Sequence, residues 1–210
     1  MTKKITSLAL TAALALAFAA PTFAQADKQP AKKQPAPPIP GAGSGGNTPH
    51  ATTGTVIGPN RNDGSRVTIT YGRPFSVHPR KGGEPRKIWG GLVPWDKPDR
   101  LGADEATTIL TEHPIVVAGT TIPAGIHTLY IIPSENGVSK LAFSKKVGGW
   151  GIPVNVDNDV VRADLKKEAL SDPVDQLKIE VKNTNPAAFG GTIEISWERT
   201  KFSLPFTVKK

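Results

Sequence analysis

The stretch Ile126-His-Thr-Leu-Tyr-Ile-Ile132 decides the fold class, together with the segment that follows it. It consists almost entirely of residues that favour β-strands, and it ends at Pro133, which cannot donate a ladder hydrogen bond. Glu135-Asn-Gly137 is a turn signal, and Lys140–Ser144 is a second short apolar run. The sequence therefore predicts an antiparallel β-hairpin at this point of the chain.

Short runs of the same kind recur on both sides of the hairpin. Arg66–Tyr71 alternates apolar and polar residues, and Gln176–Lys182 places Leu, Ile and Val on one face, as half-buried strands do. The other predicted strands are Thr107–Thr111, Ile115–Val117, Val160–Leu165, Thr192–Glu198 and Phe202–Val208. About ten short strands without βαβ spacing predict an all-β fold, a single antiparallel β-sandwich or jelly-roll-like domain.

Two details refine this prediction. The only segment that suggests a helix is Val161–Leu170, but it lacks a stripe of period 3.6 and ends before Pro173. The last run contains Pro205, which favours an edge position for that strand.

The N-terminal residues are expected to lie outside the folded domain. Met1–Ala26 has two lysines, an apolar run and an Ala-x-Ala end, which is typical of a secretory signal peptide; a retained membrane anchor is the alternative. Asp27–Pro59 is rich in Pro, Gly and Lys, and we expect a disordered linker there. The β-sandwich domain is then expected to span residues 60–210. The protein would reside in the periplasm or outside the cell, with no transmembrane span after cleavage.

Charge and cysteine content exclude several classes of function. The formal net charge is +8, but Lys3 and Lys4 leave with the signal peptide and the linker holds two further positive charges. This modest excess and the lack of a recognition motif argue against a nucleic-acid partner. A weak attraction to anionic envelope polymers remains open, as does a role in solubility alone. The absence of cysteine excludes disulfides, thiol chemistry and a lipoprotein anchor.

A set of motifs in fixed order gives a resemblance. They are Gly72-Arg-Pro74, Ile88-Trp-Gly-Gly-Leu-Val-Pro-Trp95, Arg100-Leu-Gly-Ala-Asp-Glu-Ala-Thr107, Pro123-Ala-Gly-Ile-His-Thr-Leu129, Trp150-Gly151, Asp159-Val-Val-Arg162 and Ile195-Ser-Trp197. From Arg61 to Val208 the chain resembles the bacterial domain of unknown function 2911 family. The resemblance implies an exported, mainly β protein and supplies no substrate. The chain departs from the family pattern with Asp104 where Asn is usual, His127 where Tyr is usual, Asp99 where Trp is common, and a longer basic insert, Val77–Pro85.

The segment between Tyr71 and Tyr130 gathers the residue types that recognise ligands. The candidate binding residues are Arg73, Trp89, Trp95, Arg100, Asp104, Glu105 and His127. Arg73 precedes a proline, so its backbone is expected to be extended, and its guanidinium would bind a carboxylate or phosphate or else pair with an acid at 104 or 105. The two indoles flank a glycine-rich loop and would either stack on a sugar or fill the core.

Asp104 and Glu105 are neighbours, so in an extended chain their side chains point to opposite faces. We therefore expect that they do not form the carboxylate pair of a glycosidase, and that one faces inward and meets an arginine such as Arg100. His50 is expected to be solvated in the linker. His78, His113 and His127 show no metal-ligand spacing, and neither a metal nor a cofactor is expected. No Gly-x-Ser-x-Gly elbow is present.

Three interpretations of function remain. The first is a non-catalytic exported module that binds a small molecule, a glycan or another envelope component through the candidate residues. The second is a hydrolase acting on glycans or esters, with Glu105 or His127 as general acid or base. The third is a purely structural envelope domain. The sequence does not decide whether the protein is an enzyme.

Overall fold

The computed structural model describes residues 48–77 and 82–210 of the chain. They belong to one compact unit, Ile39–Lys210. The expected signal peptide and most of the expected linker lie outside the described residues, as does His78.

The first of two antiparallel sheets has six strands in the order β1-β2-β3-β6-β7-β8. Its strands are β1 (His50–Ile57), β2 (Ser65–Gly72), β3 (Thr108–Thr111), β6 (Gly125–Ile132), β7 (Lys140–Ser144) and β8 (Asp159–Asp164). The β6–β7 hairpin pairs Ile132 with Lys140 and Thr128 with Ser144, as the turn signal between them predicts. Every pairing in this sheet is antiparallel.

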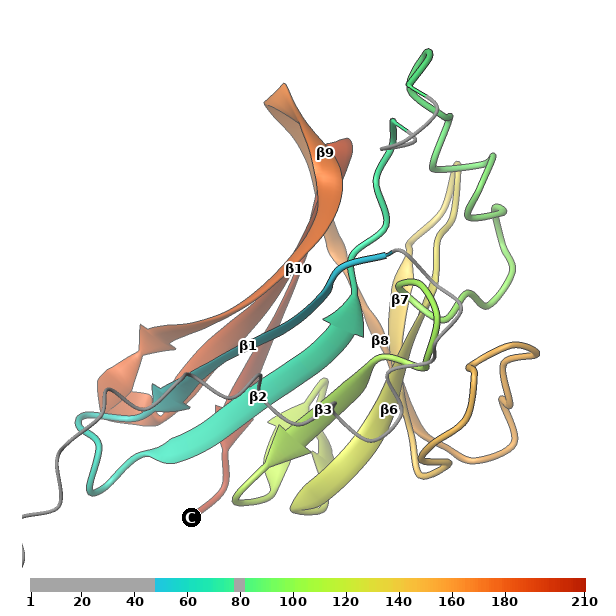
Figure 1. The fold of residues 1–210 in the computed structure, drawn as a ribbon. Coiled ribbons are helices and arrows are strands. Elements are labelled where there is room, and N and C mark those ends of the chain that lie inside the picture. Colours follow the sequence, from blue (N-terminus) through green and yellow to red (C-terminus); the bar gives the residue numbers. More distant parts are fainter. Residues whose placement is uncertain (1–47, 78–81) are drawn as a thin grey trace, which may run out of the picture. The chain divides into compact units, whose positions relative to one another are not determined.

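The second sheet has four strands in the order β5-β4-β10-β9. Its strands are β4 (Ile115–Val117), β5 (Thr120–Ile122), β9 (Lys166–Asn185) and β10 (Gly190–Val208). The long β9–β10 ribbon forms most of this sheet, with a single 3-10 turn, Pro186–Ala188, at its tip. Figure 1 shows this ribbon in orange and red behind β1 and β2.

The core lies between the two sheets. Leu129, Leu141 and Phe143 of the first sheet are fully buried in the same cluster as Ile195 and Phe202 of the second. Burial of such side chains stabilises the fold by about 1.5–3 kcal/mol each. The prediction of an all-β antiparallel sandwich is thus confirmed.

Three expectations about individual elements are corrected. The folded domain begins inside the predicted linker, because His50–Ile57 pairs along its whole length with β2. Val161–Leu170 is strand rather than helix, divided between β8 and β9. The strand that contains Pro205 lies between β4 and β9 instead of at an edge. Its proline is tolerated because the pairing with β9 ends at Ser203 and the pairing with β4 involves only Thr207 and the residue after it.

A β-bulge explains how one strand carries two predicted runs. Inward-facing residues of β10 have odd numbers up to Trp197 and even numbers from Phe202 onward. The register against β9 shifts on both sides of Glu198, whose φ is 51°. The bulge shifts the alternation of inward-facing side chains from odd to even residue numbers, so that both runs face the core.

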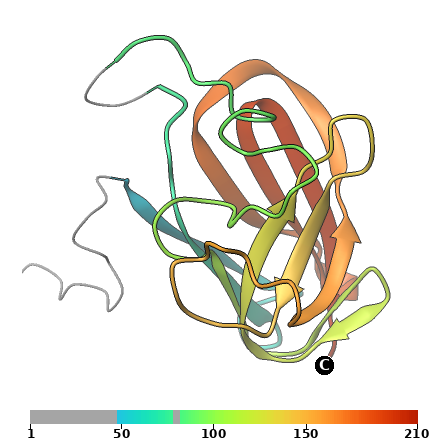
Figure 2. The same ribbon diagram turned by 90° about the vertical axis from the view of Figure 1, so that its right-hand side faces the viewer.

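The face of the six-stranded sheet that points away from the core is called the outer face below. On β6, His127 and Leu129 point into the sandwich, so Thr128 and Tyr130 point to the outer face. Tyr130 is nevertheless only 1% exposed, and Ala142 of β7 is fully buried. The loop of residues 145–158, between β7 and β8, lies across this part of the sheet (Figure 2).

Candidate functional site

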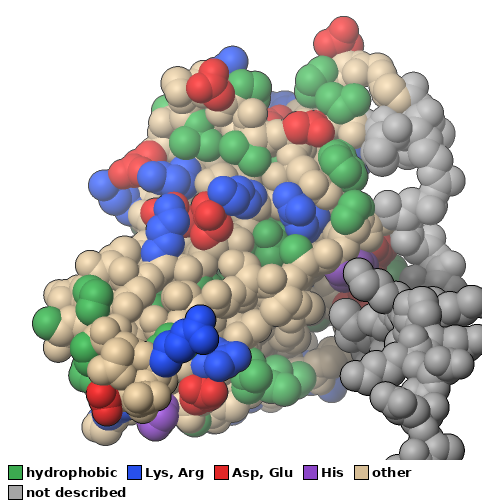
Figure 3. Space-filling model, turned by 60° about the vertical axis from the view of Figure 1, so that its left-hand side comes forward, with side chains coloured by type: hydrophobic (Ala, Val, Ile, Leu, Met, Phe, Trp, Pro, Cys, Tyr) green, Lys and Arg blue, Asp and Glu red, His purple; other side chains and the backbone are tan. Residues whose placement is uncertain are grey.

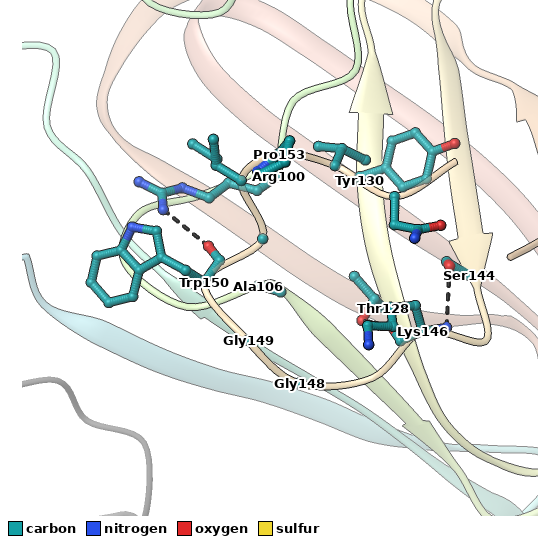
Figure 4. A pocket seen from close by; sticks show the side chains of 14 residues that line it. Arg100, Ala106, Thr128, Tyr130, Ser144, Lys146, Gly148, Gly149, Trp150 and Pro153 are labelled. Atoms are coloured by element: carbon teal, nitrogen blue, oxygen red, sulfur yellow. Dashed lines mark hydrogen bonds between the residues drawn. The ribbon is translucent and has the colours of Figure 1, made fainter. Parts of the chain in front are cut away.

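A hollow of about 180 Å³ lies between the outer face and the 145–158 loop. We call it the outer-face hollow; its lining is Arg100, Ala106, Thr128, Tyr130, Ser144, Lys146, Gly148, Gly149, Trp150, Gly151, Ile152, Pro153, Val154 and Asn155. Figure 4 shows the hydroxyl-bearing residues on the strand side and the arginine and indole on the loop side. The hollow thus combines hydroxyls, two cations and the aromatic rings of Tyr130 and Trp150.

Arg100 joins two loops at the rim of this hollow. Its Nη1 donates hydrogen bonds to the carbonyl oxygens of Asp104 at 2.6 Å and Trp150 at 3.1 Å, and its Nε donates to that of Gly102 at 3.4 Å. No ion pair between Arg100 and a carboxylate is found among the described residues, so the expected arginine–acid pair is replaced by contacts with backbone carbonyls. The guanidinium therefore positions both loops.

Trp150 is the most accessible indole of the described chain, with 49% of the residue exposed. The Arg100 guanidinium lies 5.5 Å from the centre of its ring, within cation–π range. Gly151 has φ 77°, and a Cβ there would lie 3.0–3.1 Å from the side chain of Arg100 and the backbone of Ala106. Glycine therefore allows the loop to approach closely enough to hold this indole over the arginine.

A polar network extends from Tyr130 in the lining of the hollow to the partly exposed Arg162. The Tyr130 hydroxyl donates a hydrogen bond to Asp159 Oδ2, and Arg162 Nε donates to the same oxygen at 2.5 Å. Burial and the neighbouring carboxylate raise the pKa of Tyr130 well above its usual value of 10, and the hydrogen bond with Asp159 raises the pKa of Arg162. The phenol therefore stays neutral and fixed, as a rigid wall of the site.

The loop of residues 99–107 brings a second polar group to the same face. His50 Nε2 lies 2.9 Å from Glu105 Oε2 and 3.9 Å from Asp104 Oδ2. The two acids approach the same imidazole because Asp104 has φ 65°, a left-handed conformation that Asn and Asp adopt more readily than other side chains. The expectation of opposite faces assumed an extended chain, and the turn at Asp104 corrects it.

This loop packs against Gly72, at the end of β2. A Cβ on Gly72 would lie 2.1 Å from the carbonyl oxygen of Ala103, so a larger residue would displace the loop. Thr107 closes the loop from within, because its buried hydroxyl donates to Leu101 O at 2.7 Å. The position of the acids thus depends on a backbone contact with the sheet.

Of the seven sequence-predicted residues only Arg100 lines the outer-face hollow, and four of the others also lie outside the loop of residues 99–107. Arg73 Nε donates to Leu177 O of β9 at 3.3 Å, and no ion pair links it to an acid among the described residues. Trp89 is 6% exposed, its Nε1 donates to Trp197 O at 3.3 Å, and its ring makes edge-to-face contacts with Trp197 and Phe202. Arg73 therefore links the two sheets, and Trp89 belongs to the core.

Trp95 and His127 are the other two. Trp95 is half-buried against the core, with Lys167 Nζ 5.4 Å from the centre of its ring. His127 is 5% exposed on the inward face of β6, and burial lowers the pKa of its imidazole. Its Nδ1 has no hydrogen-bond partner within residues 48–77 and 82–210. Neither side chain lines the hollow. Asp104 and Glu105, the remaining two predicted residues, lie beside His50 and do not line it either.

His50 and Trp150 are the functional candidates that sequence reasoning passed over. His50 was assigned to the linker because proline and glycine precede it, yet Thr-Thr-Gly-Thr-Val after it already alternates as a strand does. Trp150 stands between glycines in Val147-Gly-Gly-Trp-Gly, a pattern typical of a loop that presents an aromatic side chain. These signals were present in the sequence but were too local to be decisive.

Several of the other charged groups form ion pairs on the second sheet. On the second sheet Lys182 Nζ lies 2.6 Å from Glu194, and Glu168 lies 2.7 Å from both Lys166 and Lys201. These two lysines lower the pKa of Glu168 to about 2. Figure 3 shows a face on which basic and acidic side chains are interspersed. Charge is thus largely balanced locally on this face.

The described part of the chain shows neither a metal-ligand cluster nor a membrane-spanning helix. Across residues 48–77 and 82–210, no three His, Cys, Asp or Glu side chains are grouped so as to hold a metal ion. The same residues contain no helix of the length and apolar character that would cross a membrane.

The fold and the hollow define a class: an antiparallel β-sandwich with a loop-covered polar hollow on its outer face. Comparison with known families supplies the particular family. The family described as "Protein of unknown function (DUF2911)" matches residues 53–206, from β1 to β10, and the chain belongs to it. No curated protein and no solved structure gives a match.

Proposed function

We propose that the protein is an exported, non-catalytic module that binds a hydroxyl-rich, negatively charged ligand, such as an acidic sugar unit, in the outer-face hollow. The observation that carries the proposal is the exposed indole of Trp150, which lines the same hollow as the hydroxyl-bearing residues Thr128 and Tyr130. Aromatic faces stack on the apolar faces of sugar rings, and hydroxyls supply both donors and acceptors.

The charge of the lining favours an anionic group on the ligand. Arg100 and Lys146 line the hollow, whereas no Asp or Glu does among the described residues. Arg100 already donates to carbonyls through Nη1 and Nε, which leaves Nη2 as a donor for a carboxylate. The fixed phenol of Tyr130 and its charged partners keep the wall in place before the ligand binds, which reduces the entropic cost of binding.

The test is a titration of the protein with galacturonate disaccharide and with the neutral cellobiose. We expect saturable binding of the acidic sugar, weakened at least tenfold, about 1.4 kcal/mol, by Trp150→Ala. Val138→Ala is the matched control, because Val138 is 55% exposed and lies outside the lining of the hollow. Binding that Trp150→Ala leaves unchanged contradicts the proposal. If no sugar or other small carboxylate binds or raises the melting temperature, the purely structural interpretation gains support.

A hydrolase remains the second candidate because of one observation. The two carboxylates of Asp104 and Glu105 approach one imidazole, His50, instead of pointing apart. A histidine–carboxylate group of this kind can transfer protons. In that case Glu105→Gln would abolish turnover of a glycan or ester while leaving affinity nearly intact. The non-catalytic proposal predicts no turnover by the unchanged protein.

A further inference from the structure

A row of hydroxyl-bearing side chains crosses the outer face from the edge strand to the outer-face hollow. Each member lies directly opposite the next on neighbouring strands: Thr52, Thr70, Thr108, Thr128 and Ser144. They all share the face of Tyr130, because paired residues of adjacent strands point to the same side of a sheet. We call this line the hydroxyl row.

The hydroxyl row is long enough to contact several sugar units. Adjacent strands lie about 4.8 Å apart, so the four threonines alone span roughly 14 Å. Thr52 Oγ1 and Thr70 Oγ1 are 3.1 Å apart, and Thr128 Oγ1 donates to Lys146 O at 2.5 Å. A hydroxyl that donates one bond retains two acceptor sites, so the four threonines can still receive hydrogen bonds from a ligand. Ser144 is only 1% exposed and its hydroxyl accepts from Lys146 N, so it ends the row inside the protein.

A hollow lies at each end of the hydroxyl row. Thr128 and Ser144 line the outer-face hollow, and Thr52 lines a second, more open hollow of about 660 Å³ over β1 and β2. Arg61 and Arg66 are the charged residues of that second hollow, which no acid lines among the described residues. The row therefore connects Arg100 and Lys146 at one end with Arg61 and Arg66 at the other, where Arg66 Nε lies 3.7 Å from Glu112 Oε1.

Apolar surface lies directly beside the hydroxyl row. Leu110 and Ile126 face each other across β3 and β6, two residues along from Thr108 and Thr128 on the same face. They are 45% and 51% exposed. An exposed apolar pair next to a line of hydroxyls suits the ring of a pyranose, which has C–H faces and a hydroxyl-bearing rim.

We propose that the outer face binds a linear acidic polysaccharide laid across the strands along the hydroxyl row, with its ends in the two hollows. This inference rests on the proposed binding of an acidic sugar unit in the outer-face hollow, and extends that site to a polymer. The hydroxyl row hydrogen-bonds the chain, Leu110 and Ile126 contact its ring faces, and the cations at both ends bind its carboxylates.

The test compares galacturonate disaccharide with galacturonate hexasaccharide, measured by calorimetric titration. We expect the hexasaccharide to bind at least tenfold more tightly, and cellohexaose to bind more weakly than the acidic chain. Thr70→Val/Thr108→Val keeps side-chain shape and removes two hydroxyls. It should lower the affinity for the hexasaccharide about tenfold and leave the affinity for the disaccharide unchanged, because each neutral hydrogen bond contributes roughly a factor of 2–12 in affinity.

Thr192→Val is the matched control. Thr184 Oγ1 and Thr192 Oγ1 also lie 3.1 Å apart across a strand pair, but on the second sheet. This substitution should not change either affinity, and melting temperatures verify that all variants fold.

The outcomes separate the two proposals. Equal affinity for both chain lengths, or tighter hexasaccharide binding that the double valine variant leaves intact, overturns the extended site. If Trp150→Ala still weakens the disaccharide, the proposed function stands without it. If neither saccharide binds, both proposals fail.

Discussion

Replacing Trp89 and Trp150 by alanine should lower the stability of the protein by very different amounts. Trp89 is 6% exposed, with its ring centre 6.2 Å from that of Trp197 and 5.1 Å from that of Phe202. Removing a buried indole of this kind costs about 3–5 kcal/mol, a large part of a total stability of about 5–15 kcal/mol. For a domain of this size the melting temperature should fall by roughly 6–20 °C.

Trp150→Ala, by contrast, removes an indole that is 49% exposed and a cation–π contact with Arg100 worth about 0.5–1 kcal/mol. Its melting temperature should fall by no more than about 4 °C. Thermal unfolding followed by circular dichroism measures both variants, and Trp89→Phe serves if Trp89→Ala does not fold. Equal destabilisation by the two alanine substitutions would refute the assignment of one indole to the core and the other to the surface.

Two further predictions concern Gly72, which contacts the loop of residues 99–107, and the surface carboxylate of Glu168. Gly72→Ala should lower the melting temperature and weaken ligand binding, because its Cβ would lie 2.1 Å from Ala103 O and displace the loop that Arg100 holds. Gly137→Ala is the control: its Cβ would contact only the side chain of Ser134, so the melting temperature should hardly change. Glu168 should titrate with a pKa of about 2 in NMR. This folded-state pKa lies below the usual glutamate value of 4.5, so the stabilising effect of the ionised Glu168 is complete above pH 4.5 and is lost as the pH falls toward 2. A measured pKa near 4.5 would contradict the paired geometry.

Most strands could be predicted because alternation is a local property. Ile115–Val117 and Lys140–Ser144 were predicted at their observed bounds, since each run is short and is bounded by turn residues. The start of β1 was not predicted, because the proline- and glycine-rich composition of residues 27–59 as a whole hides the alternating strand at their C-terminal end. The two predicted runs join into β10 through a bulge at Glu198, and no local feature of the sequence predicts this bulge.

The candidate site was less predictable, because convergence of side chains depends on backbone turns and strand register. Arg100, Asp104 and Glu105 lie in one loop, but the residues that they contact, Trp150 and His50, lie about 50 residues away in sequence. The prediction for His127 depended on which face of β6 points outward, which only its pairing and the packing of the second sheet determine.

By itself, the sequence determined an all-β chain and its family, because strand-forming runs, turn residues and ordered motifs are written along the chain. Only the tertiary structure decided which tryptophan is accessible, which carboxylates share an imidazole, and that five hydroxyls from five strands form one line. The physical reason is that pairing between segments distant in sequence sets the register of each strand and the face to which its side chains point. A shift of one residue would turn every side chain of a strand to the other face.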